Sequence, residues 1–451
     1  MPGYMPHTDD EIAAMLALLG LDDLDDLFTV VPEALRLVGG LDLPPGAPEP
    51  DVMAHVGAAA ATNRPAGRDL VCFAGGGAYD HEIPAVTRAL ASRSEFVTSY
   101  TPYQPEVAQG VLQAVFEFQT LLARLSGVPV ANASLYDGAA ALVEAVNLGV
   151  AASGRQKVLL SEGVHPTWRQ VVRTFAAGTG HDVEDVALRD GVTAWPDAAA
   201  EGGAPGVVVV AYPNALGCLE DLGRVRGLCD ATGALMVVAF DPVCAGILRS
   251  PGEWGADVVV GEGQALGMPL SFGGPYLGLF ACTMAHVRRL PGRLVGETVD
   301  AEGRRAYVTT LRAREQDIRR EKATSNVCTN QTLMAVTAAI QMGWLGSSGM
   351  AEIALRSARG ARYCRDSLLA IPGVEPFATA PVVREFALRL PAPAPLVVDR
   401  LVEEGFLAGI PLVGDFGDFG GDDHGLLVAV TERRTRDEID AFAAAFEKAV
   451  R

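Results

Sequence analysis

An alternation of short apolar runs with amphipathic segments between residues 71 and 280 is the feature that most limits the possible folds. The runs are rich in valine and lie at 128–133, 158–160, 207–211, 235–240 and 258–260. Helical patterns lie between them, such as 105–126, which opens with a proline, and 221–232, which Gly233 follows. Strands that are apolar on both faces and alternate with helices predict a mostly parallel sheet covered by helices on both sides.

The first 62 residues are predicted to form a helical arm with a stiff linker. Thr8 and Glu11 have the spacing of a capping box before an apolar helical run, which Gly20 closes. Four prolines then interrupt residues 41–50 and favour an extended connection. Such an arm packs either on its own body or on a partner subunit, and the sequence leaves both possibilities open.

Beyond the arm we expect a large domain at 63–330 and a smaller C-terminal α/β domain at 331–451. A long helical pattern near 330–342 leads into the smaller domain. That domain ends with a predicted strand at 426–430 and a helix that starts with a capping box at Thr435. The length and the 49% hydrophobic content fit a globular α/β enzyme.

The net charge of −19 argues against a nucleic-acid partner, because neutralising phosphates requires a basic face. One local basic strip does occur at 304–322, where seven cations are interleaved with three carboxylates. That pattern favours a salt-bridged helix over an anion-binding surface.

The N-terminal residues lack the basic and apolar regions of a signal peptide, and no apolar run reaches the length of a membrane span. We therefore expect a cytoplasmic protein that does not bind membranes. The seven cysteines show no paired metal-ligand spacing, which predicts reduced, mostly buried thiols and no metal site.

Polar residues that follow the predicted strands occur in the order of a pyridoxal-phosphate (PLP) pocket. His165 comes first, then Asn214, then Asp241 directly after the run at 235–240. In such a pocket a helix N-terminus binds the phosphate, an imidazole stacks on the ring and an aspartate holds the pyridine nitrogen. For Asp241 by itself, a turn carboxylate capped by backbone amides is the simpler alternative.

The same pocket lacks its nucleophile. The loop where the Schiff-base lysine is expected carries Gln264, whose amide cannot form an aldimine. The helix start at 137–140 offers no hydroxyl, and the carboxylate of Asp137 would repel a phosphate. The chain contains three lysines in all, at positions 157, 322 and 448.

Two further segments have unusual compositions. At 99–106, Tyr100 and Tyr103 lie beside prolines that would hold them rigidly, which suits hydroxyl donors at an interface, and aromatic core packing is the alternative. The glycine run at 75–77 matches neither a dinucleotide fingerprint nor a P-loop, and it favours a flexible turn.

Five stretches together resemble one family, the glycine cleavage system P protein. They are FAGGGAYDH at 73–81, SYTPYQPE at 99–106, ANASLYDG at 131–138, GQALGMPLSFGGPYLG at 263–278 and REKATSNVCTNQ at 320–331. The similarity spans nearly the whole chain, and the last two motifs are highly specific. The length and the missing lysine resemble subunit 1 of the split form of this family.

The resemblance implies a PLP-dependent transferase of fold type I, like aspartate aminotransferase. It implies a heterotetramer with two copies each of subunits 1 and 2, in which PLP is bound by subunit 2 and none is expected on this chain. The implied reaction is that of glycine dehydrogenase (decarboxylating): glycine loses carbon dioxide, and its aminomethyl group passes to the lipoyl group of H protein. The chain alone would be inactive.

By the same resemblance, Tyr100, Tyr103 and Tyr136 reach toward the partner's PLP and the substrate carboxylate. Lys322 and Asn326 are implied to make phosphate or interface contacts. Gln264 then marks the position of the lost lysine, and His165 and Asp241 are relics of an ancestral pocket.

Two alternatives to this function stay open. A self-sufficient PLP enzyme would use Lys322 as its aldimine lysine, although the charged neighbours of that residue would keep its amine solvated and protonated. A non-catalytic scaffold subunit would have the same sequence features but would not need the tyrosine hydroxyls.

Overall fold

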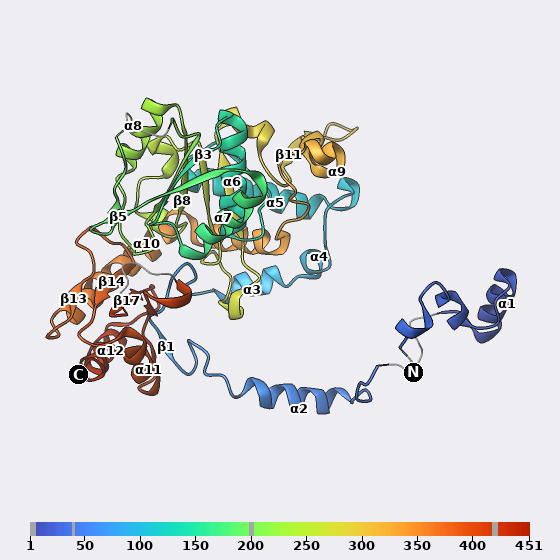
Figure 1. The fold of residues 1–451 in the computed structure, drawn as a ribbon, viewed down its shortest axis with the longest axis horizontal. Coiled ribbons are helices and arrows are strands. Elements are labelled where there is room, and N and C mark those ends of the chain that lie inside the picture. The colour runs from blue at the N-terminus through green and yellow to red at the C-terminus, as the bar shows by residue number, and fades with distance from the viewer. Residues whose placement is uncertain (1–5, 38–40, 198–202, 417–422) are drawn as a thin grey trace. The chain divides into compact units, whose positions relative to one another are not determined.

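A seven-stranded sheet forms the centre of residues 64–451 in the computed structural model. In order across the sheet the strands are β2 (Val130–Ala131), β10 (Gly278–Cys282), β9 (Val258–Glu262), β8 (Leu235–Phe240), β7 (Val207–Tyr212), β3 (Lys157–Ser161) and β4 (Asp182–Val186). The five strands from β9 to β4 are parallel, and β10 is antiparallel to both of its neighbours. The mostly parallel sheet is confirmed, and each of the five valine-rich runs contributes a strand to it (Figure 1).

The structure describes residues 6–37, 41–197, 203–416 and 423–451. These divide into two compact units, Met1–Asn63 and Arg64–Arg451. The predicted boundary between a large and a small domain near residue 330 stays a prediction, because a 38-residue helix, α10 (Thr332–Leu369), begins there and packs on the seven-stranded sheet.

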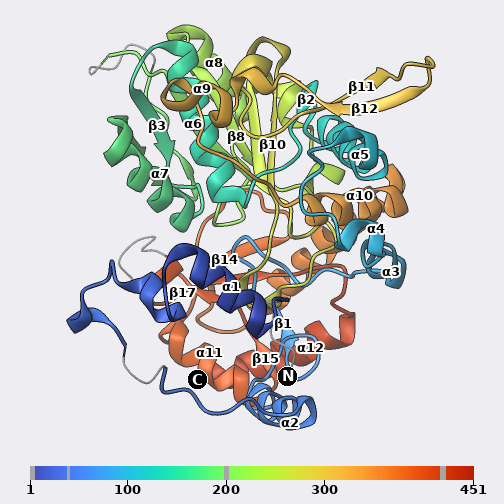
Figure 2. The same cartoon turned by 90° about the vertical axis from the view of Figure 1, so that its right-hand side faces the viewer.

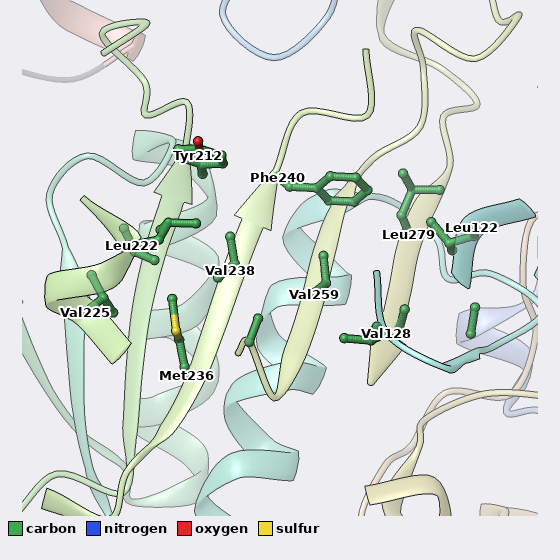
Figure 3. Close-up of a cluster of buried hydrophobic side chains, with 14 of the residues drawn as sticks. Leu122, Val128, Tyr212, Leu222, Val225, Met236, Val238, Phe240, Val259 and Leu279 are labelled. Carbon is green, nitrogen blue, oxygen red and sulfur yellow. The ribbon is translucent and has the colours of Figure 1, made fainter. Parts of the chain in front are cut away.

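Both faces of the sheet are buried, because alternate residues along each strand point in opposite directions. Val208 and Val210 of β7 pack against α5 (Gln109–Ser126), α8 (Leu222–Thr232) and α10. Val207 and Val209 pack against α6 (Gly138–Ser153) and α7 (Pro166–Thr179) on the other face. Figure 3 shows part of the first cluster, where Leu222 and Val225 of α8 approach the strands. Burial of each such valine stabilises the fold by roughly 1.5–3 kcal/mol relative to exposure.

A second sheet and two helices form the C-terminal part of this unit. Its strands, in order, are β13 (Glu375–Pro376), β14 (Glu385–Arg389), β17 (Gly425–Ala429) and β16 (Ile410–Pro411). The helices are α11 (Ala394–Glu403) and α12 (Arg436–Ala449), the latter with the predicted capping box at Thr435. Strand β1 (Val71–Cys72) pairs in parallel with β15 (Phe406–Leu407), as Figure 2 shows below the large sheet. The first strand of this unit therefore pairs within the C-terminal part, and the strands of the large sheet follow it in the sequence.

Smaller elements complete the unit. They are helices α3 (Ala85–Ala91), α4 (Ser94–Val97) and α9 (Gln316–Arg319), and the paired strands β5 (Leu188–Arg189) and β6 (Val192–Thr193).

The first unit is helical, in agreement with the sequence. Helix α1 (Asp9–Leu19) has both hydrogen bonds of the Thr8–Glu11 capping box and ends at Gly20 in the left-handed conformation. Helix α2 (Glu49–Ala60) follows the proline-rich stretch. Among the described arm residues, Leu16 is the one buried apolar side chain, so the arm has no hydrophobic core of its own.

The helix predicted from the basic strip at 304–322 is wrong. The strip begins with β12 (Arg305–Thr309), which forms a hairpin with β11 (Val295–Val299), and continues through short turns. The strand is stabilised by Tyr307, whose buried ring packs against α5 from one face of the hairpin. Positive φ angles at Leu311 and Arg320 then prevent a continuous helix. Ion pairs such as Arg304–Asp300 and Arg312–Asp317 are nevertheless present.

No helix in the described part of the chain is long and apolar enough to span a bilayer.

Candidate functional site

The carboxyl ends of the parallel strands meet at a small cavity, as the sequence predicts. His165, Asn214 and Asp241, which follow β3, β7 and β8, all line it. The cavity has a volume of about 90 Å³. Pockets for small-molecule cofactors are usually several times larger, from about 300 Å³ upward. The chain's own side chains account for this small volume.

Asp241 is paired with an arginine from the C-terminal part. Its Oδ2 atom lies 2.5 Å from Nη2 of Arg384, whose side chain is 3% exposed. Its Oδ1 atom accepts hydrogen bonds from the amides of Val243 (2.8 Å) and Cys244 (3.2 Å), as expected for a turn carboxylate. The Arg384 guanidinium also stacks 3.5 Å above the ring of Tyr79. Asp241 therefore already has a cationic partner where a pyridine nitrogen would bind.

The Arg384 charge is fixed by its surroundings. Burial by itself lowers the pKa of Arg384, but the surrounding acidic groups, Asp241 first and Glu385 among the others, together outweigh burial and raise that pKa well above its ordinary value. Arg384 also contacts Nε2 of His81, whose Nδ1 lies 2.6 Å from Glu432. Arg384 could not be predicted from the sequence, because it lies more than a hundred residues beyond Asp241.

A glutamate occupies the N-terminus of α6, where a PLP phosphate would bind. Oε2 of Glu262 accepts a hydrogen bond from the amide of Gly138 at 2.9 Å. Its Oε1 accepts from the amides of Gln264 and Leu277, both at 3.0 Å. The indole of Trp168 covers the same point, because a Cβ on Gly138 would lie 2.1 Å from it. A helix N-terminus stabilises one anion, and here that anion is a side-chain carboxylate.

Gln264 is a structural residue at the position of the lost lysine. Its side chain is 1% exposed. Oε1 accepts from the amide of Tyr79 at 2.8 Å, and Nε2 donates to the carbonyls of Tyr79 (3.1 Å) and Met268 (2.8 Å). An ammonium group could not accept the first of these bonds.

His165 and the glycine run close the cavity from the other side. Nδ1 of His165 accepts from the amide of Thr167 at 3.2 Å and so caps α7, and Nε2 lies 2.8 Å from the carbonyl of Gly76. The amide of Gly76 donates to Oε1 of Glu385 at 2.6 Å. A Cβ on Gly75 would lie 2.2 Å from that same oxygen, so glycine is required there. The run was predicted to be a flexible turn, but hydrogen bonds hold it over the cavity.

These contacts do not fit PLP. The phosphate position holds Glu262 and Trp168, the nitrogen position holds Arg384, and Gln264 supplies no amine. Lys322, the alternative aldimine lysine, is exposed on a short turn and does not line the cavity.

The buried Glu262 predicts a pH-dependent stability. Burial raises the pKa of Glu262 from 4.5 to about 7 despite its three amide donors. Because the folded state then binds the proton more tightly than the unfolded chain, the contribution of Glu262 is most favourable below about pH 4.5 and is lost as the pH rises through about 7. We expect a smaller drop in unfolding free energy between pH 5 and pH 8 for Glu262→Gln than for the unchanged protein, measured by urea denaturation.

Glu144 provides the matched comparison for that prediction. Burial raises the pKa of Glu144 to about 7 as well, although Ser325 is its hydrogen-bond partner. The Glu262→Gln, Glu144→Gln double variant should therefore show the flattest pH profile. An unchanged profile in both variants would show that these carboxyls titrate normally.

The predicted tyrosines lie away from this cavity. Tyr100 and Tyr103 have exposed fractions of 77% and 57%, and Tyr136, at 37%, just precedes the N-cap of α6. Tyr103 lines a second cavity of about 470 Å³, together with Thr101, Arg293, Val327 and Cys328. The structure thus brings the 99–106 motif beside the 320–331 motif, whereas neither Tyr100 nor Tyr136 lines this cavity.

Lys322 and Asn326 are exposed on the turns at one side of the second cavity, although neither side chain lines it. The 320–331 segment is anchored by Asn330, whose Nδ2 donates to the carbonyl of Ala133 and to Oγ of Ser134, both at 2.9 Å. Arg293 was missed in the sequence, because nothing in its Pro-Gly-Arg-Leu context distinguishes it from a surface arginine.

Known proteins share this architecture over its whole length. A family model described as glycine cleavage system P-protein matches residues 2–446. A protein of Moorella thermoacetica named "Probable glycine dehydrogenase (decarboxylating) subunit 1" is 46% identical over 450 residues, covering 98% of each chain. A protein of the same name from Desulforamulus reducens is 45% identical over 443 residues, again covering 98% of each.

A comparison with solved structures supports the same family assignment. A crystal structure titled glycine decarboxylase (P-protein) of the glycine cleavage system, in inhibitor-bound form, superposes with a TM-score of 0.90 at 45% identity and covers 99% of this chain and 100% of that one. Mouse CSAD in apo form matches with a TM-score of 0.68 at 15% identity, covering 95% and 92%, which shows the fold alone. The fold is that of PLP-dependent enzymes of type I, as predicted. On the strength of the full-length family match and of relatives at about 45% identity, this chain belongs to the glycine cleavage system P-protein family.

Proposed function

We propose that this chain is the subunit of a split glycine dehydrogenase (decarboxylating) that does not carry PLP, and that its lysine-bearing partner, subunit 2, binds the cofactor. The observation that supports this most strongly is the filled pocket, in which Glu262, Gln264 and Arg384 occupy the positions of the PLP phosphate, the Schiff-base lysine and the pyridine nitrogen. The names of its relatives, which call them subunit 1, agree with this division.

In the assembled enzyme, this chain supplies side chains to the partner's active site. PLP on subunit 2 supplies an electron sink for the loss of carbon dioxide from glycine. The exposed hydroxyls of Tyr100, Tyr103 and Tyr136 orient the substrate there, and Lys322 and Asn326 make interface or phosphate contacts. The aminomethyl product passes to the lipoyl group of H protein. The complex contains two copies of each subunit, and it acts in the cytoplasm.

The N-terminal arm, residues 1–62, packs on subunit 2 in this proposal. It has one buried apolar residue, Leu16, among its described residues, so its apolar side chains need another surface. Eleven carboxylates and one arginine, Arg36, occur in residues 1–63. The surface that binds the arm is therefore expected to be apolar and basic.

Reconstitution tests the function. The two subunits are purified separately, and carbon dioxide release from labelled glycine is measured with PLP and lipoylated H protein. We expect no release from either subunit alone and turnover when they are mixed. A chain that begins at Arg64 lacks the contacts of the arm with subunit 2. We expect its Kd for subunit 2 to be at least about tenfold higher, which corresponds to a loss of about 1.4 kcal/mol of binding free energy. Turnover by this chain alone would contradict the proposal.

A further inference from the structure

Arg293 is a buried cation that forms no close ion pair in the described part of the chain. The side chains of Arg384 and Arg434 are 3% and 4% exposed, and Arg293 is 7% exposed. Arg434 pairs with Asp80 at 3.2 Å. Arg384 pairs with Asp241, whereas no carboxylate in the described part of the chain lies within 4 Å of the Arg293 guanidinium. A buried charge without a close counter-ion destabilises the folded chain, and a bound anion would offset that effect.

The existing contacts of Arg293 are long and neutral. Its Nη1 lies 3.4 Å from Oγ1 of Thr101, and its Nη2 lies 3.3 Å from the hydroxyl of Tyr103. Its guanidinium carbon lies 5.1 Å from the centre of the Tyr103 ring. Both hydrogen bonds are longer than a well-formed N–H···O bond of about 2.9 Å. Thr101 and Tyr103 therefore orient the guanidinium, which can still donate further hydrogen bonds to a bound anion.

The side chain lines the cavity of about 470 Å³ rather than a closed core. Of the other charged residues that line the cavity, Arg312 pairs with Asp317 at 3.4 Å. Glu315 also lines the cavity, but it forms no ion pair with Arg293 within 4 Å in the described part of the chain, and burial raises the pKa of its carboxyl. An anion that enters the cavity would meet Arg293 with two hydroxyls beside it.

We propose that Arg293, with the hydroxyls of Thr101 and Tyr103, binds the carboxylate of glycine while subunit 2 holds the amino group. This inference rests on the proposed function and names the group that recognises the substrate. A guanidinium presents parallel N–H donors that match the two oxygens of a carboxylate, and Tyr103 extends the site toward the partner.

The chemistry of decarboxylation predicts how this contact affects turnover. The carboxylate loses its charge as it leaves as carbon dioxide, so its ion pair with Arg293 is weaker in the transition state than in the substrate complex. An interaction of that kind lowers KM without raising kcat. Arg293→Met should therefore raise KM for glycine by about 10- to 100-fold and leave kcat within about threefold.

The test uses the complete complex of both subunits with PLP and H protein. KM and kcat for glycine are measured for the unchanged chain, Arg293→Met and Arg293→Lys, where the lysine variant keeps the charge and should recover part of the loss. Binding of glycine and of methylamine, which lacks the carboxylate, is followed by the visible absorbance of the cofactor. We expect Arg293→Met to weaken binding of glycine and not of methylamine. Arg249→Met removes an exposed arginine that also stacks on an aromatic ring, that of Trp254, and should change neither.

Three results would overturn the inference. They are an unchanged KM for Arg293→Met, an equal loss of glycine and methylamine binding, and a loss of assembly with subunit 2, which would mean that Arg293 binds an acidic side chain of the partner. Failure of the proposed function is separate, because then the unchanged complex itself would not decarboxylate glycine.

Discussion

Replacing Tyr100 and Tyr103 together by phenylalanine should lower glycine decarboxylation by the assembled complex by about 100- to 1000-fold, the range found when a positioned donor is removed from an active site. Both rings are exposed, at 77% and 57%, so phenylalanine keeps their packing. The substitution also removes the Tyr103 hydroxyl that lies 3.3 Å from Nη2 of Arg293. The tyrosine hydroxyls would otherwise orient the substrate in the partner's site, where small misplacements have large effects on rate. The rate constant for carbon dioxide release at saturating H protein is the measurement.

The same double variant separates a catalytic subunit from a scaffold. Size-exclusion chromatography of the mixed subunits should show an unchanged complex, because phenylalanine keeps the ring and its packing. Val107→Ala, which removes an exposed apolar side chain a few residues further along the chain, serves as the control and should keep nearly full activity. Full activity in the tyrosine variant with intact assembly would favour the scaffold alternative.

Arg384→Met should reduce the free energy of unfolding by about 3–5 kcal/mol, the usual effect of removing one partner from a buried ion pair. The substitution leaves the Asp241 carboxylate without its cation at 2.5 Å and removes the stacking on Tyr79. It also leaves His81 and Glu432 without the neighbouring guanidinium. Chemical denaturation followed by circular dichroism, with the same slope for both proteins, would measure the change.

A double-mutant cycle identifies the cause of that destabilisation. Adding Asp241→Asn to Arg384→Met should recover part of the loss, because the carboxylate is then neutral and still accepts from the turn amides. Arg436→Met, at an exposed ion pair with Asp440, should leave the unfolding free energy almost unchanged. A small effect of Arg384→Met would mean that water solvates the pair.

The sheet could be predicted from the sequence because its strands are buried on both faces. Short apolar runs such as 207–211 and 235–240 fit a strand that is buried on both faces. In the structure they form β7 and β8 with nearly the expected bounds. The helix predicted for the basic strip at 304–322 was wrong for the opposite reason. Its charges fit either a helix or a hairpin, and the contact of Tyr307 with α5, which decides between them, joins segments far apart in the chain.

Some residues of the candidate site could likewise be predicted from the sequence, and others could not. The missing lysine, His165 and Asp241 were visible because they follow predicted strands in order. Arg384 could not be found, because only the folded chain brings the C-terminal part against Asp241. Glu262 lies two residues before Gln264, at the end of β9, and a carboxylate that close to the lost lysine position was a signal in the sequence for a filled phosphate site. Arg293 had no signal in the sequence at all.

In the proposed function, PLP is bound by subunit 2 and not by this chain. The most direct measurement is to load the purified chain and the mixed complex with PLP, reduce each with borohydride, and map the labelled lysine by mass spectrometry. We expect no aldimine absorbance and no label on this chain alone, and one labelled lysine per subunit 2 in the complex. Stoichiometric labelling of Lys322, or of any lysine of this chain, would contradict it.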